Sequence, residues 1–407
     1  MYDLLGGMRV IEGSSFVASP SCGLYLAQMG AEVIRFDSIG GGPDFNRWPL
    51  DPANGASFYW EGLNKGKKSI AIDLKRPEGR EIAQRLITAP GDEGGLFLTN
   101  FPVGGFLAHE KLAALRPDLV TVRVMGNADG SSALDYTVNS AVGVPYLTGP
   151  ASMGEVPVNN MLPAWDLLTG AYAAFAMVSA ERNRRATGAG GEVLVPLADM
   201  AISTLAHLGQ IAEVTFTGAD RPRLGNEVFG AFGRDFATSD GRRMMVMAIT
   251  AKQWRGLLDA LAIGDQVAAV EAERGVSFAA DEGLRFDHRD RLMPIVEAAM
   301  QKRTFEDLRA DFDAREVCWG PYQTVLQAAQ DPALVTANPM FSQIQHPSGR
   351  TYPAPGAAGT IPSQPRGPAV AAPRLGQHTE EVLAEVLRMD AGEIARLHDA
   401  GLVAGVR

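Results

Sequence analysis

The chain has 407 residues and a net charge of −10, because 37 lysines and arginines are set against 47 aspartates and glutamates. At roughly 150 residues per domain, this length predicts two or three domains, with a core that needs no disulfide or structural metal. The acidic balance excludes nucleic acid and anionic membranes as default partners, because their phosphates repel the chain. Any anionic ligand therefore requires a local cluster of cations.

The cysteine and histidine content predicts no metal site and no disulfide framework. Cys22 and Cys318 are far apart, and the six histidines form no pair at ligand spacing. The first residues show no basic patch followed by an apolar run, and no stretch reaches 18 consecutive apolar residues. We therefore expect a cytoplasmic protein that does not bind a membrane.

Strand-like and helical patterns alternate over the first 130 residues. The strand patterns are Met8–Glu12, Glu32–Asp37, Ser69–Leu74, Gly95–Asn100 and Leu119–Met125. Helical spacing follows the first strand from Ala18 to Met29, Pro77 opens a second helix, and a third surrounds Leu112. This alternation predicts an α/β fold with a doubly wound parallel sheet covered by helices on both faces.

The carboxyl ends of the strands are where such a sheet binds its ligands. Four segments come to that edge: Gly13–Ala18, the residues after Asp37, Asn100–Phe101, and Gly126. We therefore expect the functional site there.

The rest of the chain predicts a second, smaller domain. A long helix is expected from about Trp165 to Arg185 and another over Met200–Phe216, before a glycine-rich stretch and a β-hairpin near residues 236–249. Helical segments then surround Trp254, Leu292 and Phe305. We expect a large α/β domain over 1–224, completed by 331–407, and a small α+β domain over 225–330. Within the tail, residues 340–375 are rich in Pro and Gly and are expected to form an ordered linker, with two short helices after them.

Nucleotide-binding and hydrolase motifs are absent. Asp37 follows Gly13 at a distance that suits a dinucleotide site, but the intervening turn, EGSSFVASPSCG, lacks the G-x-G-x-x-G pattern. No G-x-x-x-x-G-K-[ST] run and no G-x-S-x-G elbow occur either.

The strongest basic cluster lies just before the third strand, where Asn64–Ser69 reads NKGKKS. One interpretation is a phosphate grip, with Arg35 and Arg47 as possible additions. The other is a solvated turn, which is the commoner role of such a run.

Asp166 lies at the start of an otherwise apolar helix, in the segment LPAWDLLTG. The helix dipole favours a carboxylate there and keeps it ionised, so Asp166 is a candidate nucleophile. The alternative is a simple helix cap, which is the more common role of aspartate at this position.

Several segments, in order along nearly the whole chain, resemble one family. They include RVIEGSSFVASP, GLYLAQMGAEVIRFD, NKGKKSIAIDLKRPEGRE, TNFPVGG, WDLLTG, the GN…FG.DFATSDG stretch, and APRLGQHTEEVL. This combination is similar to the class III CoA transferases and their racemase relatives.

The resemblance implies an interlocked homodimer with its active site between the two domains. It implies that Asp166 is the catalytic nucleophile and that CoA enters as part of an acyl-CoA substrate, with no tightly bound cofactor. The residues that match the family's CoA-binding positions are Val17, Ala18, Arg35, Lys67, Asn100 and Phe101.

The resemblance also implies a place for the acyl group. Backbone N–H groups of the glycine-rich loop Gly225–Gly233, with Gly230 and Gly233 as substrate residues, are candidates for stabilising oxyanions. Finer matches favour a branch that moves CoA between the two carboxyl groups of one mesaconate. That reaction requires a cation for the second carboxylate, and the candidates are Arg47, Arg223 and Arg234.

Two positions depart from the family pattern. Leu134 stands where the racemase branch has an acid–base histidine, and a leucine cannot move a proton. Pro102 stands where many members have an arginine after the Asn-Phe pair. The alternatives that remain are an intermolecular CoA transferase, a racemase, which Leu134 disfavours, and an inactive CoA-binding dimer.

Overall fold

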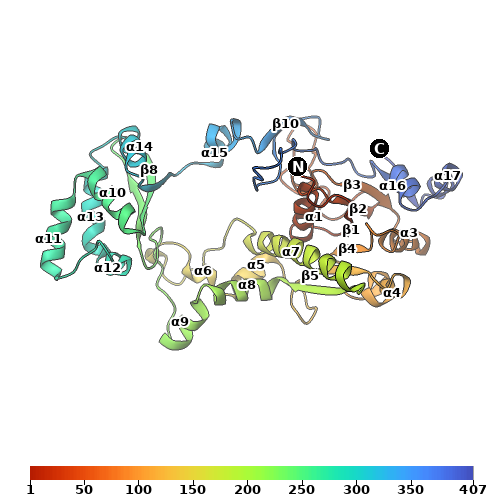
Figure 1. Cartoon of the computed structure of the whole chain (residues 1–407), viewed down its shortest axis with the longest axis horizontal. Helices are drawn as coiled ribbons and strands as arrows, with labels where there is room; N and C mark the ends of the chain where they lie inside the picture. Colours follow the sequence, from red (N-terminus) through yellow and green to blue (C-terminus); the bar gives the residue numbers. More distant parts are fainter. Residues whose placement is uncertain (407) are drawn as a thin grey trace. The chain divides into compact units, whose positions relative to one another are not determined.

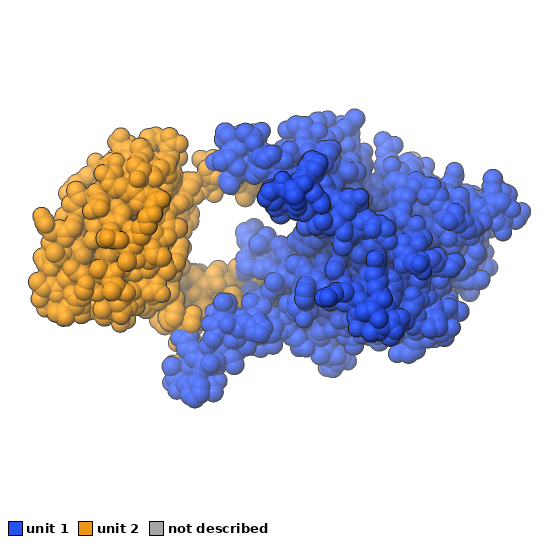
Figure 2. Space-filling view, viewed as in Figure 1, with its two compact units in different colours: residues 1–142, 160–218, 330–407 blue, residues 143–159, 219–329 orange. Residues whose placement is uncertain are grey.

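The structure is a computed structural model that describes residues 1–406, and it divides into two compact units, coloured separately in Figure 2. Unit 1 contains Met1–Val142, Asn160–Gly218 and the described chain from Gln330 onward. Unit 2 contains Gly143–Asn159 and Ala219–Ala329. The sequence placed the segment Gly143–Asn159 in the large domain, and the structure groups it with the small one.

Unit 1 is built on a seven-stranded sheet in the order β12-β3-β2-β1-β4-β5-β6 (Figure 1). Its strands are β1 Arg9–Gly13, β2 Glu32–Ser38, β3 Lys68–Ile72, β4 Leu96–Thr99, β5 Val120–Met125, β6 Gly191–Pro196 and β12 Val403–Ala404. Every pair is parallel except β12 with β3. The predicted parallel sheet is confirmed, while the two outermost strands, β6 and β12, were not predicted.

Helices cover both faces of this sheet, because successive strand residues point to opposite sides. Val10 belongs to the core under α1 (Ala18–Gln28) and α7 (Ala164–Thr187), whereas Ile11 belongs to the core on the other face. That second face is covered by α3 Pro77–Ile87, α4 His109–Leu115, α16 Thr379–Glu385 and α17 Ala391–Asp399. This is the doubly wound arrangement that the sequence predicted.

The remaining elements of unit 1 include two departures from expectation. They are α2 Phe58–Leu63, η1 Gly105–Leu107, α5 Asp135–Ala141, α8 Leu197–His207, α9 Gln210–Thr217, η3 Pro332–Thr336, β10 Phe341–Gln345 and β11 Thr351–Pro355. The single helix expected over Met200–Phe216 is broken at Gly209, whose φ of 78° lies in the left-handed region that favours glycine. An antiparallel hairpin, β10–β11, occupies part of the expected linker.

Unit 2 contains a three-stranded antiparallel sheet in the order β7-β8-β9. Its elements are α6 Val144–Leu147, η2 Ala151–Met153, β7 Phe232–Ala237, β8 Arg243–Ala248, α10 Ala251–Leu261, α11 Gly264–Arg274, α12 Glu282–Asp287, α13 Arg289–Met300, α14 Phe305–Ala314 and β9 Cys318–Pro321, with α15 Val325–Gln330 after them. Phe232, Phe236 and Trp254 pack in its core. The hairpin and the helices near Trp254, Leu292 and Phe305 are confirmed.

Candidate functional site

A pocket of about 670 Å³ opens at the carboxyl ends of β1, β4 and β5 in unit 1. It is lined by Ser15–Ala18, Asn100–Val103, Val124–Gly126, Ala128–Leu134, Asp166, Leu194 and Leu197. Five of the predicted site residues are therefore together: Val17, Ala18, Asn100, Phe101 and Asp166. Pro102 and Leu134, the two departures from the family pattern, also line it.

The turn from β1 into α1 forms one wall of this pocket. The Ser15 backbone N–H donates to Asn100 Oδ1 (3.0 Å), and Asn100 Nδ2 donates to the Ser15 carbonyl (2.7 Å). The Phe16 N–H donates to Asp44 Oδ2 (3.2 Å), and Phe16 has a φ of 69°, which is rare for a residue with a side chain. Helix α1 begins directly after this turn without a side-chain cap, so its first N–H groups lie beside the pocket.

Asp166 lies in the first turn of α7, but it does not cap that helix. The cap comes from Asp135 of α5, whose Oδ2 accepts from the backbone N–H groups of Trp165 (2.8 Å) and Asp166 (3.0 Å). Within residues 1–406 the Asp166 carboxylate makes no hydrogen bond or ion pair. The helix-cap interpretation of Asp166 is therefore wrong, and the carboxylate is available to the pocket.

The Asp166 carboxylate is also poised near neutral pH. Burial and the negative charge of Asp135 raise its pKa from 3.8 to about 6, and the nearby Arg47 guanidinium opposes this rise. We expected the helix dipole to hold the carboxylate ionised. In the structure the loss of solvation is the larger effect, so Asp166 is mostly, but not fully, ionised at pH 7.

This raised pKa predicts that Asp166→Asn stabilises the protein. Because the native carboxyl binds its proton more tightly than the unfolded one, the cost of ionising it is fully present above pH 6 and disappears below pH 4. A rise from 3.8 to about 6 corresponds to at most about 3 kcal/mol, and partial exposure reduces this to about 1–2 kcal/mol. Urea unfolding at pH 8 and pH 4 measures the difference. Equal stabilisation at both pH values would contradict the assignment.

Arg47 is the cation that faces this carboxylate. Its guanidinium carbon lies 5.4 Å from the centroid of the Phe16 ring and 5.5 Å from that of Tyr59. Its side chain is exposed, and within residues 1–406 it forms no ion pair. Burial raises the pKa of Tyr59 to about 12, so this phenol stays neutral beside the two charges.

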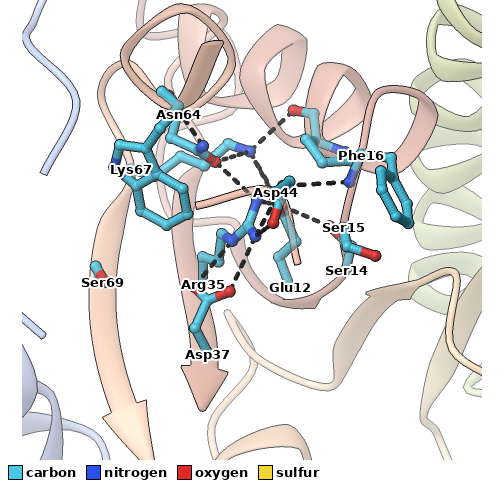
Figure 3. A network of polar contacts seen from close by, with 12 residues as sticks. Glu12, Ser14, Ser15, Phe16, Arg35, Asp37, Asp44, Asn64, Lys67 and Ser69 are labelled. Carbon is cyan, nitrogen blue, oxygen red and sulfur yellow. Dashed lines mark hydrogen bonds and ion pairs between the residues drawn. The ribbon is translucent and has the colours of Figure 1, made fainter. Parts of the chain in front are cut away.

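Two predicted CoA-binding cations, Arg35 and Lys67, belong instead to a buried network (Figure 3). Arg35 is 1% exposed and pairs with Asp37 (2.9 Å), Asp44 (2.9 Å) and Glu12 (3.7 Å). Lys67 Nζ lies 2.9 Å from Glu12 Oε2 and donates to the Pro20 carbonyl. Their donors are directed at protein groups, and the predicted contact of either side chain with CoA stays a prediction.

The rest of the basic cluster is also directed at protein groups. Lys65 is buried and donates to the carbonyl of Gly62, and burial lowers the pKa of Lys65 to about 8. Lys68 pairs with Glu32 and Glu381, each at 2.7 Å. The start of β3 lies beside the carboxyl end of β1, since Glu12 aligns with Arg35 and Arg35 with Ser69. The phosphate-grip interpretation stays a prediction.

The other predicted substrate residues lie in unit 2. Gly230 has a φ of 76°, and Gly233 is inside β7, where its carbonyl accepts from the Val228 N–H. Arg223 is 9% exposed and donates to the carbonyls of Pro145, Thr148 and Val156, which anchors the segment Gly143–Asn159. Arg234 pairs with Glu297 (2.9 Å). Arg223 and Arg234 are thus engaged by protein groups.

Sequence reasoning missed three residues that build the site: Asp44, Arg123 and Asp135. Arg123 is fully buried, pairs with Glu192 and donates to the carbonyls of Phe101, Pro102 and Leu107, so it shapes the loop after β4. Nothing in the sequence signals partners so far away. No group of metal-ligating side chains occurs among the described residues, and no helix there is long and apolar enough to cross a bilayer.

The fold is a doubly wound α/β sheet with a pocket at its carboxyl edge, and comparison with known proteins establishes the family. Residues 5–379 match CoA-transferase family III, so the chain belongs to that family. The chain is 47% identical over 406 residues to the 2-methylfumaryl-CoA isomerase of Chloroflexus aurantiacus, covering 100% of this chain and 99% of that one.

More distant relatives support the same family assignment. The succinyl-CoA–D-citramalate CoA-transferase of the same organism is 27% identical, over 97% of this chain and 96% of its own. Among solved structures, a CAIB/BAIF family protein from Brucella suis superposes with a TM-score of 0.76 at 26% identity, covering 95% of this chain and 100% of that one.

Proposed function

We propose that this enzyme moves CoA between the two carboxyl groups of mesaconate, converting 2-methylfumaryl-CoA into 3-methylfumaryl-CoA. The observation that carries the proposal is the unpartnered Asp166 carboxylate in a pocket lined by the expected CoA-binding residues. The choice of acid rests on the relative named 2-methylfumaryl-CoA isomerase, which matches the chain from end to end.

The proposed chemistry is covalent catalysis by Asp166. Its carboxylate attacks the thioester carbonyl and the C–S bond breaks. CoA leaves as a thiolate, and a mixed anhydride between Asp166 and the acyl group remains. The thiolate then attacks the aspartyl carbonyl, which gives an aspartyl-CoA thioester and free mesaconate. The other carboxylate of mesaconate attacks this thioester, and the released thiolate attacks the new anhydride on the substrate side. Asp166 is regenerated, with no net change in protons or electrons.

The proposed CoA contacts are the pocket residues Val17, Ala18, Asn100 and Phe101. Uncapped N–H groups at the start of α1 and the carboxyl-end loops of β1 and β4 provide donors for anionic oxygens, as helix N-termini do. The burial of Arg35 and Lys67 gives these two a supporting role instead, because they hold the turn that carries Val17.

Arg47 is our candidate for binding the carboxylate of mesaconate that is not reacting. It is the cation whose charge is felt by Asp166, and it carries no carboxylate partner within the described chain. We retain Gly230 and Gly233 as candidate oxyanion donors on the basis of the family resemblance alone.

We expect Arg47→Met to lower kcat/KM about 10- to 100-fold at pH 7.5, the loss typical of one charged hydrogen bond. It also removes the charge that lowers the pKa of Asp166, so the rate should begin to fall at a higher pH than in the wild type. Steady-state rates between pH 5 and 9 measure both effects. Arg85→Met, an exposed change on α3, is the matched control. An unchanged acid limb would contradict the placement of Arg47.

Incubation of purified enzyme with 2-methylfumaryl-CoA alone tests the proposed reaction. Chromatography should show the second regioisomer without an added acceptor acid. In a parallel reaction, isotope-labelled mesaconate is added in excess, and retention of the bound acid predicts little label in the thioester product. Conversion that requires a second free acid would refute intramolecular transfer.

An intermolecular CoA transferase is the second candidate, because the relative at 27% identity is named for transfer between two acids. A racemase is disfavoured by Leu134, which lies in the pocket lining and has no titratable group.

We also propose that the enzyme is a homodimer. The outer side of α7 exposes Leu168, Tyr172, Phe175 and Val178, a stripe of apolar side chains that spans several turns. Such a stripe is typical of an interface with a second chain. Light scattering at micromolar concentration tests this.

A further inference from the structure

Asp135 is next to the candidate nucleophile but lies outside the pocket lining. It is the first residue of α5, it is 4% exposed, and one oxygen of its carboxylate accepts two backbone N–H groups from the first turn of α7. Leu134 and Asp166 line the pocket, whereas Asp135 does not.

A second bond ties the same two helices together. Trp165 is nearly buried, and its Nε1 donates to Asn139 Oδ1 of α5 at 3.0 Å. The first turn of α7 is therefore attached to α5 at three points: two backbone N–H groups and one indole. Because this turn carries Asp166, α5 determines where that carboxylate lies.

The cap that Asp135 provides has a chemical consequence. Asp166 is the third residue of α7, and the N–H groups of a helix's first turn lack partners within the helix and attract a nearby carboxylate. Here the groups nearest to Asp166 are already satisfied by Asp135, so the Asp166 carboxylate needs no backbone partner and can point into the pocket.

The charge of Asp135 acts on Asp166 as well. Two carboxylates this close repel, which adds to the effect of burial in raising the pKa of Asp166. The other ionisable groups around the pair are Arg47 and Tyr59, with Asp129 in the pocket lining and Asp199 exposed on the neighbouring helix α8. Of these, only Arg47 opposes the effect of Asp135 on Asp166.

We propose that Asp135 is the positioning residue of this active site: it caps α7 in place of Asp166 and so keeps the Asp166 carboxylate free to act as the nucleophile. This inference rests on the proposed function for its catalytic part, while the contact between Asp135 and α7 stands independently of it.

Two substitutions separate the charge of Asp135 from its cap. In Asp135→Asn, the amide oxygen can still accept both N–H groups, so kcat at pH 8 should stay within about threefold of the wild type. The acid limb of the pH–rate profile should move to lower pH, because one negative charge is gone. In Asp135→Ala the cap is lost, and kcat should fall about 10- to 100-fold with a smaller change in KM.

Asp390 provides the matched control. It caps α17 by accepting from the Glu393 N–H (2.9 Å), within the same unit but away from the pocket. Asp390→Ala should lower the unfolding midpoint much as Asp135→Ala does, yet leave kcat and the acid limb unchanged. A purely structural role for Asp135 predicts the same behaviour at both positions, and that result would overturn the proposal.

A readout without turnover keeps this test apart from the proposed reaction. The pH at which the stability gain of Asp166→Asn disappears reports the titration of Asp166 in the folded protein. Measured in the Asp135→Asn background, this pH should be lower than in the wild-type background. If this pH is lower but the enzyme transfers no CoA, the proposed function is refuted while the effect of Asp135 on Asp166 is supported. An unchanged pH, with an unchanged acid limb, would overturn the inference about Asp135.

Discussion

Asp166→Asn is expected to lower the rate of CoA transfer by about 10⁴-fold or more. A carboxamide cannot attack the thioester carbonyl to form an anhydride, and nucleophile replacements in other covalent enzymes cause losses of this size. No neighbouring carboxylate takes its place, because Asp135 is buried and committed to two backbone N–H groups. Initial rates of thioester interconversion, followed by chromatography, measure the effect.

The variant should still bind CoA thioesters, because the proposed CoA contacts come from other segments of the pocket. Calorimetric titration with CoA should give a dissociation constant within a few-fold of the wild type. Asp199→Asn, in the first turn of α8, removes an exposed carboxylate from the same unit and should leave the rate intact. Full activity in Asp166→Asn would exclude Asp166 as the nucleophile.

Detection of the aspartyl-CoA intermediate is an independent test of Asp166 as the nucleophile. Wild-type enzyme mixed with acyl-CoA and digested at low pH should yield a peptide containing Asp166 that carries the mass of CoA as a thioester. Asp166→Asn should yield none. An adduct on another residue would identify that residue as the nucleophile and would not affect the family assignment.

The sheet and its rim could be predicted because their signals are local. Short apolar strands alternate with amphipathic helices, and strand polarity alone places Gly13–Ala18, Asn100–Phe101 and Gly126 at one edge. The structure confirms this edge as the pocket. Strand β12 escaped prediction because it has two residues, Val403 and Ala404, and exists only through its pairing with β3.

The partners of the charged residues could not be predicted, because they are set by tertiary contacts. The run of lysines before β3 suggests a phosphate-binding site in the sequence. In the structure Lys67 donates to Glu12, which is 55 residues earlier. Asp135 reads as the start of its own helix, and nothing in the sequence indicates that it caps another helix 30 residues later. The family resemblance identified Asp166, but only the structure shows why its carboxylate is free.

We expect Arg35→Met to destabilise the protein by about 3–5 kcal/mol, the cost typical of removing one partner from a buried ion cluster. Glu12, Asp37 and Asp44 all lie against the guanidinium, and all are buried. Without it they repel one another, with Lys67 as the remaining cation of the network. Guanidinium unfolding at pH 8 measures the loss.

The dependence on pH distinguishes this cause from a simple cavity. Without Arg35 the three carboxyls should take up protons more readily in the folded state than in the unfolded one. The stability lost on substitution should therefore be greatest above pH 7 and shrink as the pH falls toward 5. Asp44→Asn in the Arg35→Met background removes one of the repelling charges. It should recover part of the lost free energy of unfolding at pH 8.

The same variant decides between the two roles considered for Arg35. If Arg35 supports the turn through Asp44, then its replacement by Met removes the anchor of Phe16, and both kcat and stability should fall. If it contacts a CoA phosphate, the KM for the thioester should rise while the unfolding midpoint stays near that of the Arg85→Met control. Because Arg35 is 1% exposed and its guanidinium is bonded to Asp37, Asp44 and Asn64, we expect the first result. That result would mean that Arg35 and Lys67 hold the turn between β1 and α1 in place, and that backbone N–H groups and Arg47 contact the anion.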